Sequence, residues 1–159
     1  MKCRLNEINK LVIHYLIPMP HTRPIISVED DEDDQYLIKR ILEELGVPNK
    51  LIFFQNGQKA LDYLTSTMEK PLMIFCDINM PVMNGLELLE VIENSPYLKK
   101  KAIPFIFLST SADKNTIEYA YQLSVQGYFV KESNFDVYRS RIGRAVHYWL
   151  DCLHPNNMA

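Results

Sequence analysis

LMIFCDINMPVMN, at residues 72–84, begins as an apolar run that contains no polar residue. Such a run is typical of a strand that is buried on both faces, as in a parallel sheet. The run ends on Asp77, and Pro81 then interrupts regular structure. Asn84 and Glu87 have the spacing of a helix N-cap and its capping-box partner, so we expect a helix to begin there. One carboxylate therefore stands at the carboxyl end of a buried strand, which is the edge where open α/β sheets bind ligands.

The composition of the chain excludes several classes of protein. The chain has 159 residues, of which 47% are hydrophobic and 23% are charged, as expected for one folded domain with a real core. The net charge of −3 gives no reason to expect nucleic-acid binding. No apolar run is long enough to span a membrane. The three cysteines show no metal-ligand spacing, which favours reduced thiols in a cytoplasmic protein.

Apolar runs alternate with helical patterns along the rest of the chain. The runs predict strands at residues 24–28, 50–54, 72–76, 103–108 and 127–130. Helices are expected after each strand, the first ending at Gly46 and the fourth covering 113–123. The fifth helix is expected to begin near Ser133, with Asp136 as its capping-box partner, and its apolar face extends to Leu153. Five strand–helix alternations specify a parallel sheet covered by helices on both faces.

The domain is predicted to span residues 24–153. Residues 1–23 precede it, and prolines at positions 18, 20 and 24 separate this segment from the first strand. We expect this N-terminal extension to be either a short helix or a disordered tail. Residues 154–159 are expected to form a short tail, with no output domain after the sheet.

Polar side chains follow four of the five predicted strands at the point where each strand ends. They are Glu29 and Asp30, Asp77, Ser109 and Lys131. A single strand that ends on a charge is common, but this complementary set at one edge of a sheet is rarely a matter of chance. Each residue also has a plainer explanation: Asp77 as a turn-forming acid, Ser109 as a helix-entry residue and Lys131 as a solvated charge.

Three carboxylates that lie close together repel one another and therefore need a cation. An oxygen-only set with few protein ligands suits Mg²⁺, which keeps several of its waters. Asp30 and Asp77 would be direct ligands, Glu29 a direct or water-mediated one, and the backbone carbonyl of Asn79 a further candidate. The later acids, residues 31–34, are explained as negative charge on a solvated face at the start of a helix.

A carboxylate beside Mg²⁺ can act as a nucleophile toward phosphorus, because phosphoryl transfer depends mainly on positioning and charge neutralisation. Lys131 would supply a second cation, and Ser109 a hydroxyl to one phosphoryl oxygen. The product on Asp77 would be an aspartyl phosphate with a charge of about −2. An inward shift of Ser109 would free space near Tyr128, whose ring could then turn from solvent to the interior. A side chain that changes position in response to a new charge nearby would act as a switch. Tyr128 could also be a plain core or surface aromatic residue.

Four motifs carry a resemblance to a known family. They are IISVEDD at 25–31, FCDINMPVMNGLELL at 75–89, FLSTSA at 107–112 and GYFVK at 127–131. With them, the chain from about residue 24 to residue 153 resembles the receiver domain of two-component response regulators. The resemblance implies a flavodoxin-like three-layer sandwich, with a five-stranded parallel sheet in the order 2-1-3-4-5 and five helices.

The resemblance also implies roles for the residues of the expected site, with Mg²⁺ or Mn²⁺ as the metal. The donor would be the phosphohistidine of a sensor histidine kinase or of a phosphotransfer protein. By resemblance, Asp77 matches the phosphoacceptor, Glu29 and Asp30 the acidic metal pair, Asn79 the loop carbonyl ligand, Ser109 the switch hydroxyl, Tyr128 the switch aromatic and Lys131 the phosphate-contacting lysine.

A receiver of this kind would either present a phosphorylation-dependent surface to a downstream protein, whose identity the sequence does not give, or pass the phosphoryl group on. That surface is expected near the fourth and fifth helices and the fifth strand. A homodimer could also form through the same two helices. Neither a nucleic acid nor a membrane is expected as a partner.

Two residues depart from the family's pattern. Glu132 follows Lys131 where the family usually has proline, often after a cis bond. A non-proline cis bond is costly, so we expect a trans bond or a rearranged loop, which could shift Lys131. Thr110 stands beside Ser109 where small residues are common, and its larger side chain could restrict water and change the lifetime of the phosphoryl group.

Two other functions compete with the switch. A phosphatase with Asp77 as nucleophile would usually carry a second acid two residues later, and Asn79 stands there instead, which argues against a phosphatase. The predicted signalling module would catalyse part of its own phosphorylation and dephosphorylation, but we do not class it as an enzyme. A degenerate receiver that binds partners without phosphorylation is the alternative. The substitution of the usual proline by Glu132 keeps this alternative open. The presence of the full set of site residues argues against a degenerate receiver: Glu29, Asp30, Asp77, Ser109 and Lys131.

Overall fold

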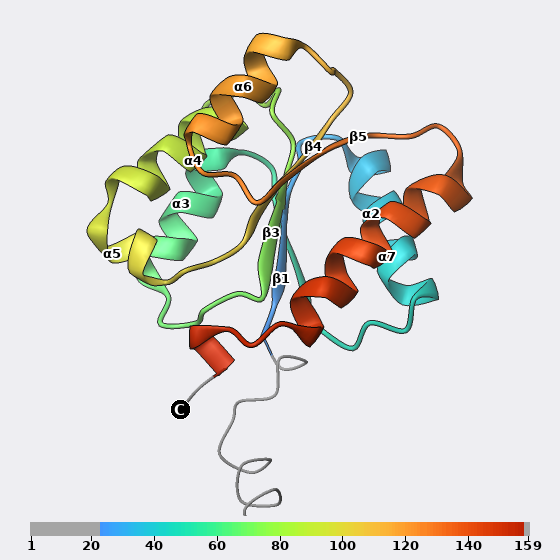
Figure 1. Ribbon diagram of the computed structural model, residues 1–159, viewed down its shortest axis with the longest axis horizontal. Coiled ribbons are helices and arrows are strands. Elements are labelled where there is room, and N and C mark those ends of the chain that lie inside the picture. The colour runs from blue at the N-terminus through green and yellow to red at the C-terminus, as the bar shows by residue number, and fades with distance from the viewer. Residues whose placement is uncertain (1–22, 158–159) are drawn as a thin grey trace, which may run out of the picture.

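A computed structural model of the protein describes residues 23–157 (Figure 1). The predicted N-terminal extension lies outside these residues, apart from Arg23. Between residues 23 and 157, no helix is long and apolar enough to cross a membrane.

Five parallel strands form one sheet, in the order β2-β1-β3-β4-β5. This order confirms the one that the family resemblance implied. The strands are β1 (Ile25–Val28), β2 (Leu51–Phe54), β3 (Met73–Cys76), β4 (Phe105–Ser109) and β5 (Gly127–Val130).

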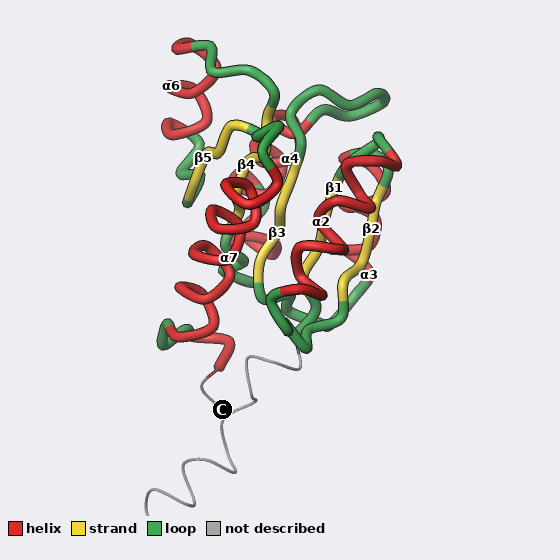
Figure 2. The backbone as a smooth tube through the Cα atoms, turned by 90° about the vertical axis from the view of Figure 1, so that its right-hand side faces the viewer, coloured by secondary structure: helices red, strands yellow, loops and turns green. Residues whose placement is uncertain are grey.

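Helices cover both faces of the sheet, so the predicted three layers are present (Figure 1). Figure 2, turned by 90°, shows α2 and α7 in front of the sheet. The helices α3, α4, α5 and α6 cover the other face (Figure 1). Their bounds are α2 (Glu32–Glu44), α3 (Gly57–Ser66), α4 (Gly85–Asn94), α5 (Pro96–Lys100), α6 (Lys114–Gln122), α7 (Phe135–Asp151) and the 3₁₀ helix η2 (Pro155–Asn157).

The inner strands are apolar because each of their faces packs against a separate core. In β3, Met73 and Phe75 face the core under α2 and α7, whereas Ile74 and Cys76 face the core under α3, α4 and α6. All four side chains are at most 1% exposed. Burial on both faces explains why the run at residues 72–76 has no polar alternation.

One helix was not predicted from the sequence. The helix α5 follows α4 after a single residue, Ser95, whose hydroxyl accepts a hydrogen bond from the backbone N–H of Leu98 at 3.3 Å. Pro96 occupies the first turn, where its missing N–H is not needed. Six α-helices are therefore present within residues 23–157 where five were expected.

The last helix begins and ends differently from the prediction. Its N-cap is Asn134 rather than Ser133, because the Asn134 side chain accepts a hydrogen bond from the N–H of Val137 at 3.1 Å. Asp136 makes an ion pair with Arg139 at 3.0 Å and is not a capping-box partner. The helix ends at Asp151, and Leu153, which was predicted to lie on its apolar face, is 88% exposed.

Candidate functional site

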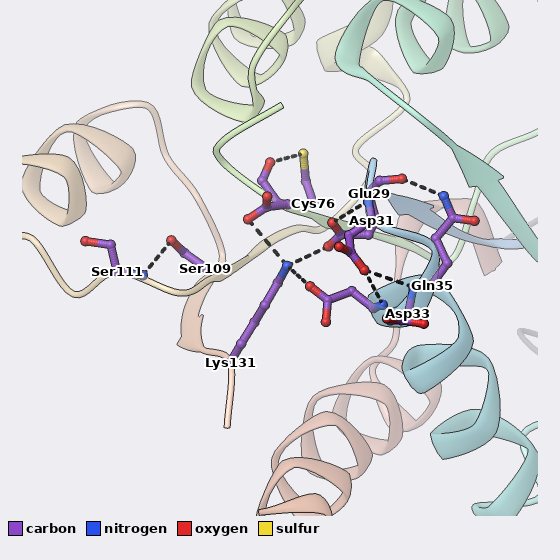
Figure 3. A network of polar contacts seen from close by, with 10 residues as sticks. Glu29, Asp31, Asp33, Gln35, Cys76, Ser109, Ser111 and Lys131 are labelled. Carbon is purple, nitrogen blue, oxygen red and sulfur yellow. Dashed lines mark hydrogen bonds and ion pairs between the residues drawn. The ribbon is translucent and has the colours of Figure 1, made fainter. Parts of the chain in front are cut away.

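The register of the sheet brings the predicted acids together at its carboxyl edge. Figure 3 shows Glu29 there, close to the end of the Lys131 side chain. Val28 of β1 pairs with Cys76 of β3, and these are the last residues of the two strands. Glu29 and Asp77 therefore follow the two strand ends side by side. The N–H of Asp77 donates a hydrogen bond to the carbonyl of Val28 at 2.9 Å, which extends the pairing to this point. Two buried strands thus deliver two carboxylates to one place.

Glu29, Asp30 and Asp77 form a compact acidic cluster. One carboxylate oxygen from each residue lies within 4.8 Å of the other two. Glu29 is 5% and Asp77 8% exposed, whereas Asp30 is open to solvent. An oxygen-only donor set with one exposed member fits a hard divalent cation such as Mg²⁺ or Mn²⁺, which retains part of its water shell.

Lys131 places an ammonium group against this cluster. Its Nζ lies 2.7 Å from Oε2 of Glu29, 2.7 Å from Oδ2 of Asp34 and 3.7 Å from Oδ1 of Asp77. The Lys131 side chain is only 10% exposed. Lys131 therefore bridges three acids, and one of them, Asp34, was assigned by the sequence to a solvated helix start.

The electrostatics of the site follow from its burial. Burial raises the pKa of Glu29 to about 7, although the hydrogen bond and charge of Lys131 oppose this rise. Burial also raises the pKa of Asp77, again against the charge of Lys131. Burial alone would lower the pKa of Lys131, but hydrogen bonds to Asp34 and Glu29 outweigh it and raise the pKa. The positive charge of Lys131 alone thus does not offset the burial of the two carboxylates, as expected for a site where a further cation binds.

Ser109 and Tyr128 are joined through one residue that the sequence did not single out, Ser111. The Ser111 N–H donates a hydrogen bond to the Ser109 hydroxyl at 3.1 Å. The Tyr128 hydroxyl donates one to the Ser111 carbonyl at 2.9 Å, and its ring lies 6.0 Å from that of Phe107. Ser109 is also tied to Lys131, because the Lys131 N–H donates to the Ser109 carbonyl at 2.8 Å.

The loop after β3 approaches α4 closely at Gly85. A Cβ atom on Gly85 would lie 2.2 Å from the carbonyl oxygen of Asp77, so only glycine fits there. The predicted capping box is confirmed: Asn84 accepts a hydrogen bond from the N–H of Glu87 at 3.0 Å and donates its own N–H to the Glu87 carboxylate at 2.8 Å.

Asn79 lies in the loop between β3 and α4 and is exposed. The role of its carbonyl as a metal ligand stays a prediction.

The two departures from the family's pattern have visible outcomes. No cis peptide bond occurs within residues 23–157, so the bond between Lys131 and Glu132 is trans, as expected. Glu132 makes an ion pair with Nη1 of Arg141 at 2.6 Å, and the same guanidinium donates to the Val130 carbonyl at 3.4 Å. Arg141 thus holds the chain on both sides of Lys131. Thr110 is exposed.

The fold and the edge of the sheet together define a receiver domain. Chemistry-bearing side chains lie at the carboxyl ends of parallel strands, and a hydroxyl and an aromatic ring are linked to them through one loop. The chain belongs to the response regulator receiver domain family, whose model matches residues 25–143. It is therefore a signalling module of two-component systems, in which receivers work with histidine kinases, rather than a classical enzyme.

Two relatives of known sequence span most of the chain. The probable methanogenesis regulatory protein FilR2 of Methanothrix harundinacea is 32% identical over 130 residues, which cover 79% of this chain and 83% of FilR2. The response regulator Rcp1 of Synechocystis is 29% identical over 132 residues, covering 80% of this chain and 88% of Rcp1.

Two solved structures have the same fold. The phosphorylated cyanobacterial phytochrome response regulator RcpA matches with a TM-score of 0.75 and 30% identity, over 84% of this chain and 97% of RcpA. The Mn²⁺-bound form of Rcp1 matches with a TM-score of 0.73 and 27% identity, over 83% and 97% of the two chains. Relatives of this chain thus include one receiver that is phosphorylated and one that binds a divalent metal.

Proposed function

We propose that this receiver accepts a phosphoryl group on Asp77, in a reaction that depends on Mg²⁺ or Mn²⁺. The donor would be the phosphohistidine of a sensor histidine kinase or of a histidine phosphotransfer protein. The observation that carries the proposal is the position of the buried Asp77 carboxylate, which shares a site with Glu29 and Asp30 and lies 3.7 Å from the ammonium of Lys131.

In the proposed reaction, a carboxylate oxygen of Asp77 attacks the phosphorus atom of the donor. The P–N bond of the phosphohistidine breaks, and its electron pair leaves with the imidazole nitrogen, which takes up a proton. Lys131 stabilises the negative charge on the phosphoryl oxygens, and the Ser109 hydroxyl donates to one of them. A metal ion held by Glu29, Asp30 and Asp77 would neutralise further phosphoryl charge.

The link through Ser111 supports the proposed switch. A phosphoryl group on Asp77 attracts the Ser109 hydroxyl, and Ser109 is bonded to the N–H of Ser111. Movement of Ser109 would therefore pull on the loop whose Ser111 carbonyl accepts the hydrogen bond of the Tyr128 hydroxyl. Tyr128 would then turn toward the space that Ser109 leaves. The charge on Asp77 is in this way converted into a change at β5.

The surface proposed to present this change comprises α6, β5 and α7, which correspond to the fourth and fifth predicted helices and the fifth strand. A groove of about 560 Å³ runs between β5 and α7 and gives a downstream protein, or a second copy in a homodimer, an apolar surface with two cations. Its lining includes Phe129, Arg141, Arg144, Tyr148 and Trp149. We place the protein in the cytoplasm, in keeping with the buried thiol of Cys76.

Phosphoryl uptake from acetyl phosphate, followed by intact-mass measurement, tests the proposal. The wild type and Asp151→Asn, a control at an exposed aspartate at the end of α7, should each gain one phosphoryl group with Mg²⁺ and none after chelation. Asp77→Asn should gain none under any condition. Absence of an adduct on the wild type with either metal would instead favour the phosphorylation-independent binding module. Donor turnover far beyond one equivalent without an adduct would favour a phosphatase.

A further inference from the structure

Lys131 has two hydrogen-bonded anchors of different kinds (Figure 3). The lysine ammonium has three protons to donate. Glu29 and Asp34 each accept at 2.7 Å, while Oδ1 of Asp77 lies farther away at 3.7 Å. Two of the three N–H groups therefore hold the ammonium in place. The third N–H group remains for an oxygen atom of Asp77 or of a phosphoryl group bound to it.

The two anchors differ in what a metal ion would do to them. Glu29 belongs to the acidic cluster with Asp30 and Asp77, whereas Asp34 does not. A cation in the cluster would compete with Lys131 for the Glu29 carboxylate. Asp34 would keep its contact with Lys131, because within residues 23–157 its carboxylate is the one acceptor of the ammonium that lies outside the cluster.

The backbone of Asp34 is held in place by the start of α2. Asp34 lies in the first turn of this helix, and its N–H donates to the side chain of the N-cap residue Asp31 at 3.1 Å. The neighbouring N–H of Asp33 donates to the same carboxylate oxygen at 2.9 Å. Because the helix end is fixed in this way, the Asp34 carboxylate reaches Lys131 from a rigid support.

We propose that Asp34 is a positioning residue that holds the Lys131 ammonium beside Asp77 while a divalent metal occupies the acidic cluster. Asp34 touches neither the phosphoryl group nor the metal, and it acts through Lys131. This role rests on the proposed phosphorylation of Asp77. It explains why the fourth acid of the run at residues 31–34 turns toward the site instead of toward solvent.

The test compares Asp34→Asn with Asp33→Asn, which removes the same charge from the same helix turn but from a side chain without a contact to Lys131. Phosphoryl uptake at saturating acetyl phosphate and Mg²⁺ should slow about fivefold in Asp34→Asn, as expected for the loss of one partly exposed charged hydrogen bond. Asp33→Asn should react at the wild-type rate, and Asp34→Glu should recover most of it. The Mg²⁺ affinities of both asparagine variants, from calorimetry, show how much Mg²⁺ is needed to saturate each variant, so that the rates are compared with the metal cluster fully occupied.

A second measurement detects the contact between Asp34 and Lys131 without a phosphoryl-transfer reaction. The ¹H–¹⁵N signal of the Lys131 ammonium, assigned by its loss in Lys131→Gln, should be protected from exchange in the Mg²⁺-loaded wild type and in Asp33→Asn, and broadened in Asp34→Asn. Equal rates and equal signals in the two asparagine variants would show that Asp34 is only a helix-start charge. Faster uptake in Asp34→Asn would show that it restrains Lys131, and would also overturn the proposal.

The two proposals can fail separately. If the wild type takes up no phosphoryl group, the proposed function fails and Asp34 has no reaction to position for, whatever the ammonium signal shows. If the wild type is phosphorylated on Asp77 and Asp34→Asn matches Asp33→Asn, the proposed function stands and the role of Asp34 fails.

Discussion

At the scale of single residues, Glu29 makes the stability of the metal-free protein depend on pH. The Glu29 carboxyl has a pKa of about 7 in the folded protein, against an ordinary value of 4.5. Between these values the folded state holds a proton that the unfolded chain has released, so the free energy of unfolding falls as the pH rises. The buried carboxylate therefore opposes folding at neutral pH, a cost that bound metal would offset.

We predict that Glu29→Gln stabilises the protein in chelator at pH 8 by about 2 kcal/mol, because a neutral side chain avoids this cost. The gain should shrink as the pH falls toward 5. Urea unfolding at both pH values measures it. Glu90→Gln, at an exposed glutamate of α4, should change the stability by less than about 0.5 kcal/mol at either pH. A loss of stability at pH 8 would mean that the ion pair with Lys131 outweighs the burial of Glu29.

Val82 is a strained residue in the loop after the phosphoacceptor strand. Its φ angle is +70°, and the N–H of Met83 donates to the carbonyl of Pro81 at 2.8 Å across it, which is a rare kind of γ-turn. A β-branched residue in this region costs about 1–3 kcal/mol. The Val82 side chain is 81% exposed, so little packing offsets the strain.

We therefore predict that Val82→Gly raises the free energy of unfolding by about 1 kcal/mol, since glycine adopts this φ without strain but loses more chain entropy on folding. The matched control is Val91→Gly in α4, where the backbone is helical and glycine should destabilise by about 1 kcal/mol. Urea unfolding with an unchanged m-value measures both. Destabilisation by Val82→Gly would show that the turn is not strained.

At the scale of elements, strand content and helix starts could largely be predicted, whereas contacts across the molecule could not. The buried strand at 72–76 and the capping box at Asn84 are local patterns, and both are confirmed. The contact between Asp34 and Lys131 joins residues 97 positions apart, so no local pattern shows it. A signal was nevertheless present, because Asp34 lies in the first turn of α2, only four residues after Asp30.

The link through Ser111 and the extra helix were missed for different reasons. Ser111 acts through its backbone N–H and carbonyl, which every residue has, so the residue type carries no information. The helix α5 is short and lacks an apolar periodicity, and only the pair Ser95 and Pro96 marked its start. The N-cap of α7 was misplaced by one residue because serine and asparagine are both good caps, and the backbone decides between them.

The ion pair of Glu132 with Arg141 fixes the loop that carries Lys131. Because both side chains are about one-third exposed, the pair should contribute less than about 1 kcal/mol. We predict a coupling energy of about 0.5 kcal/mol in a double-mutant cycle of Glu132→Gln and Arg141→Gln, from urea unfolding in low salt. Each single variant should also slow phosphoryl uptake slightly, since Lys131 becomes less well fixed. A coupling energy of zero, with wild-type uptake, would leave the pair without a role.

At the scale of the whole molecule, Lys101 joins distant parts of the chain at the amino edge of the sheet. Its Nζ donates to the carbonyls of Leu64 at 2.7 Å and Thr67 at 2.6 Å, at the end of α3. Its own carbonyl accepts from the Asn156 side chain. Lys101 is 5% exposed, so it is a buried cation that satisfies the end of a helix.

We predict that Lys101→Met lowers the free energy of unfolding by about 2 kcal/mol, because buried carbonyls at the end of α3 lose their donor. Lys100→Met, at the exposed neighbouring lysine, should change it by less than about 0.5 kcal/mol. Thermal and urea unfolding of both variants measure the difference. Equal stabilities would mean that water replaces the ammonium at no cost.

The position of Trp149 decides what an optical measurement on this protein can detect. It is the one tryptophan in the sequence, and its ring lies 6.3 Å from that of His154, beside Pro104 and Gln126, which precede β4 and β5. The indole therefore lies at the opposite edge of the sheet from Asp77. Burial, together with the charge of Arg23, lowers the pKa of His154, so the imidazole next to the indole is neutral at pH 7. Intrinsic tryptophan fluorescence should thus follow the docking and acid titration of the C-terminal segment, and it should respond little to metal binding at the acidic cluster.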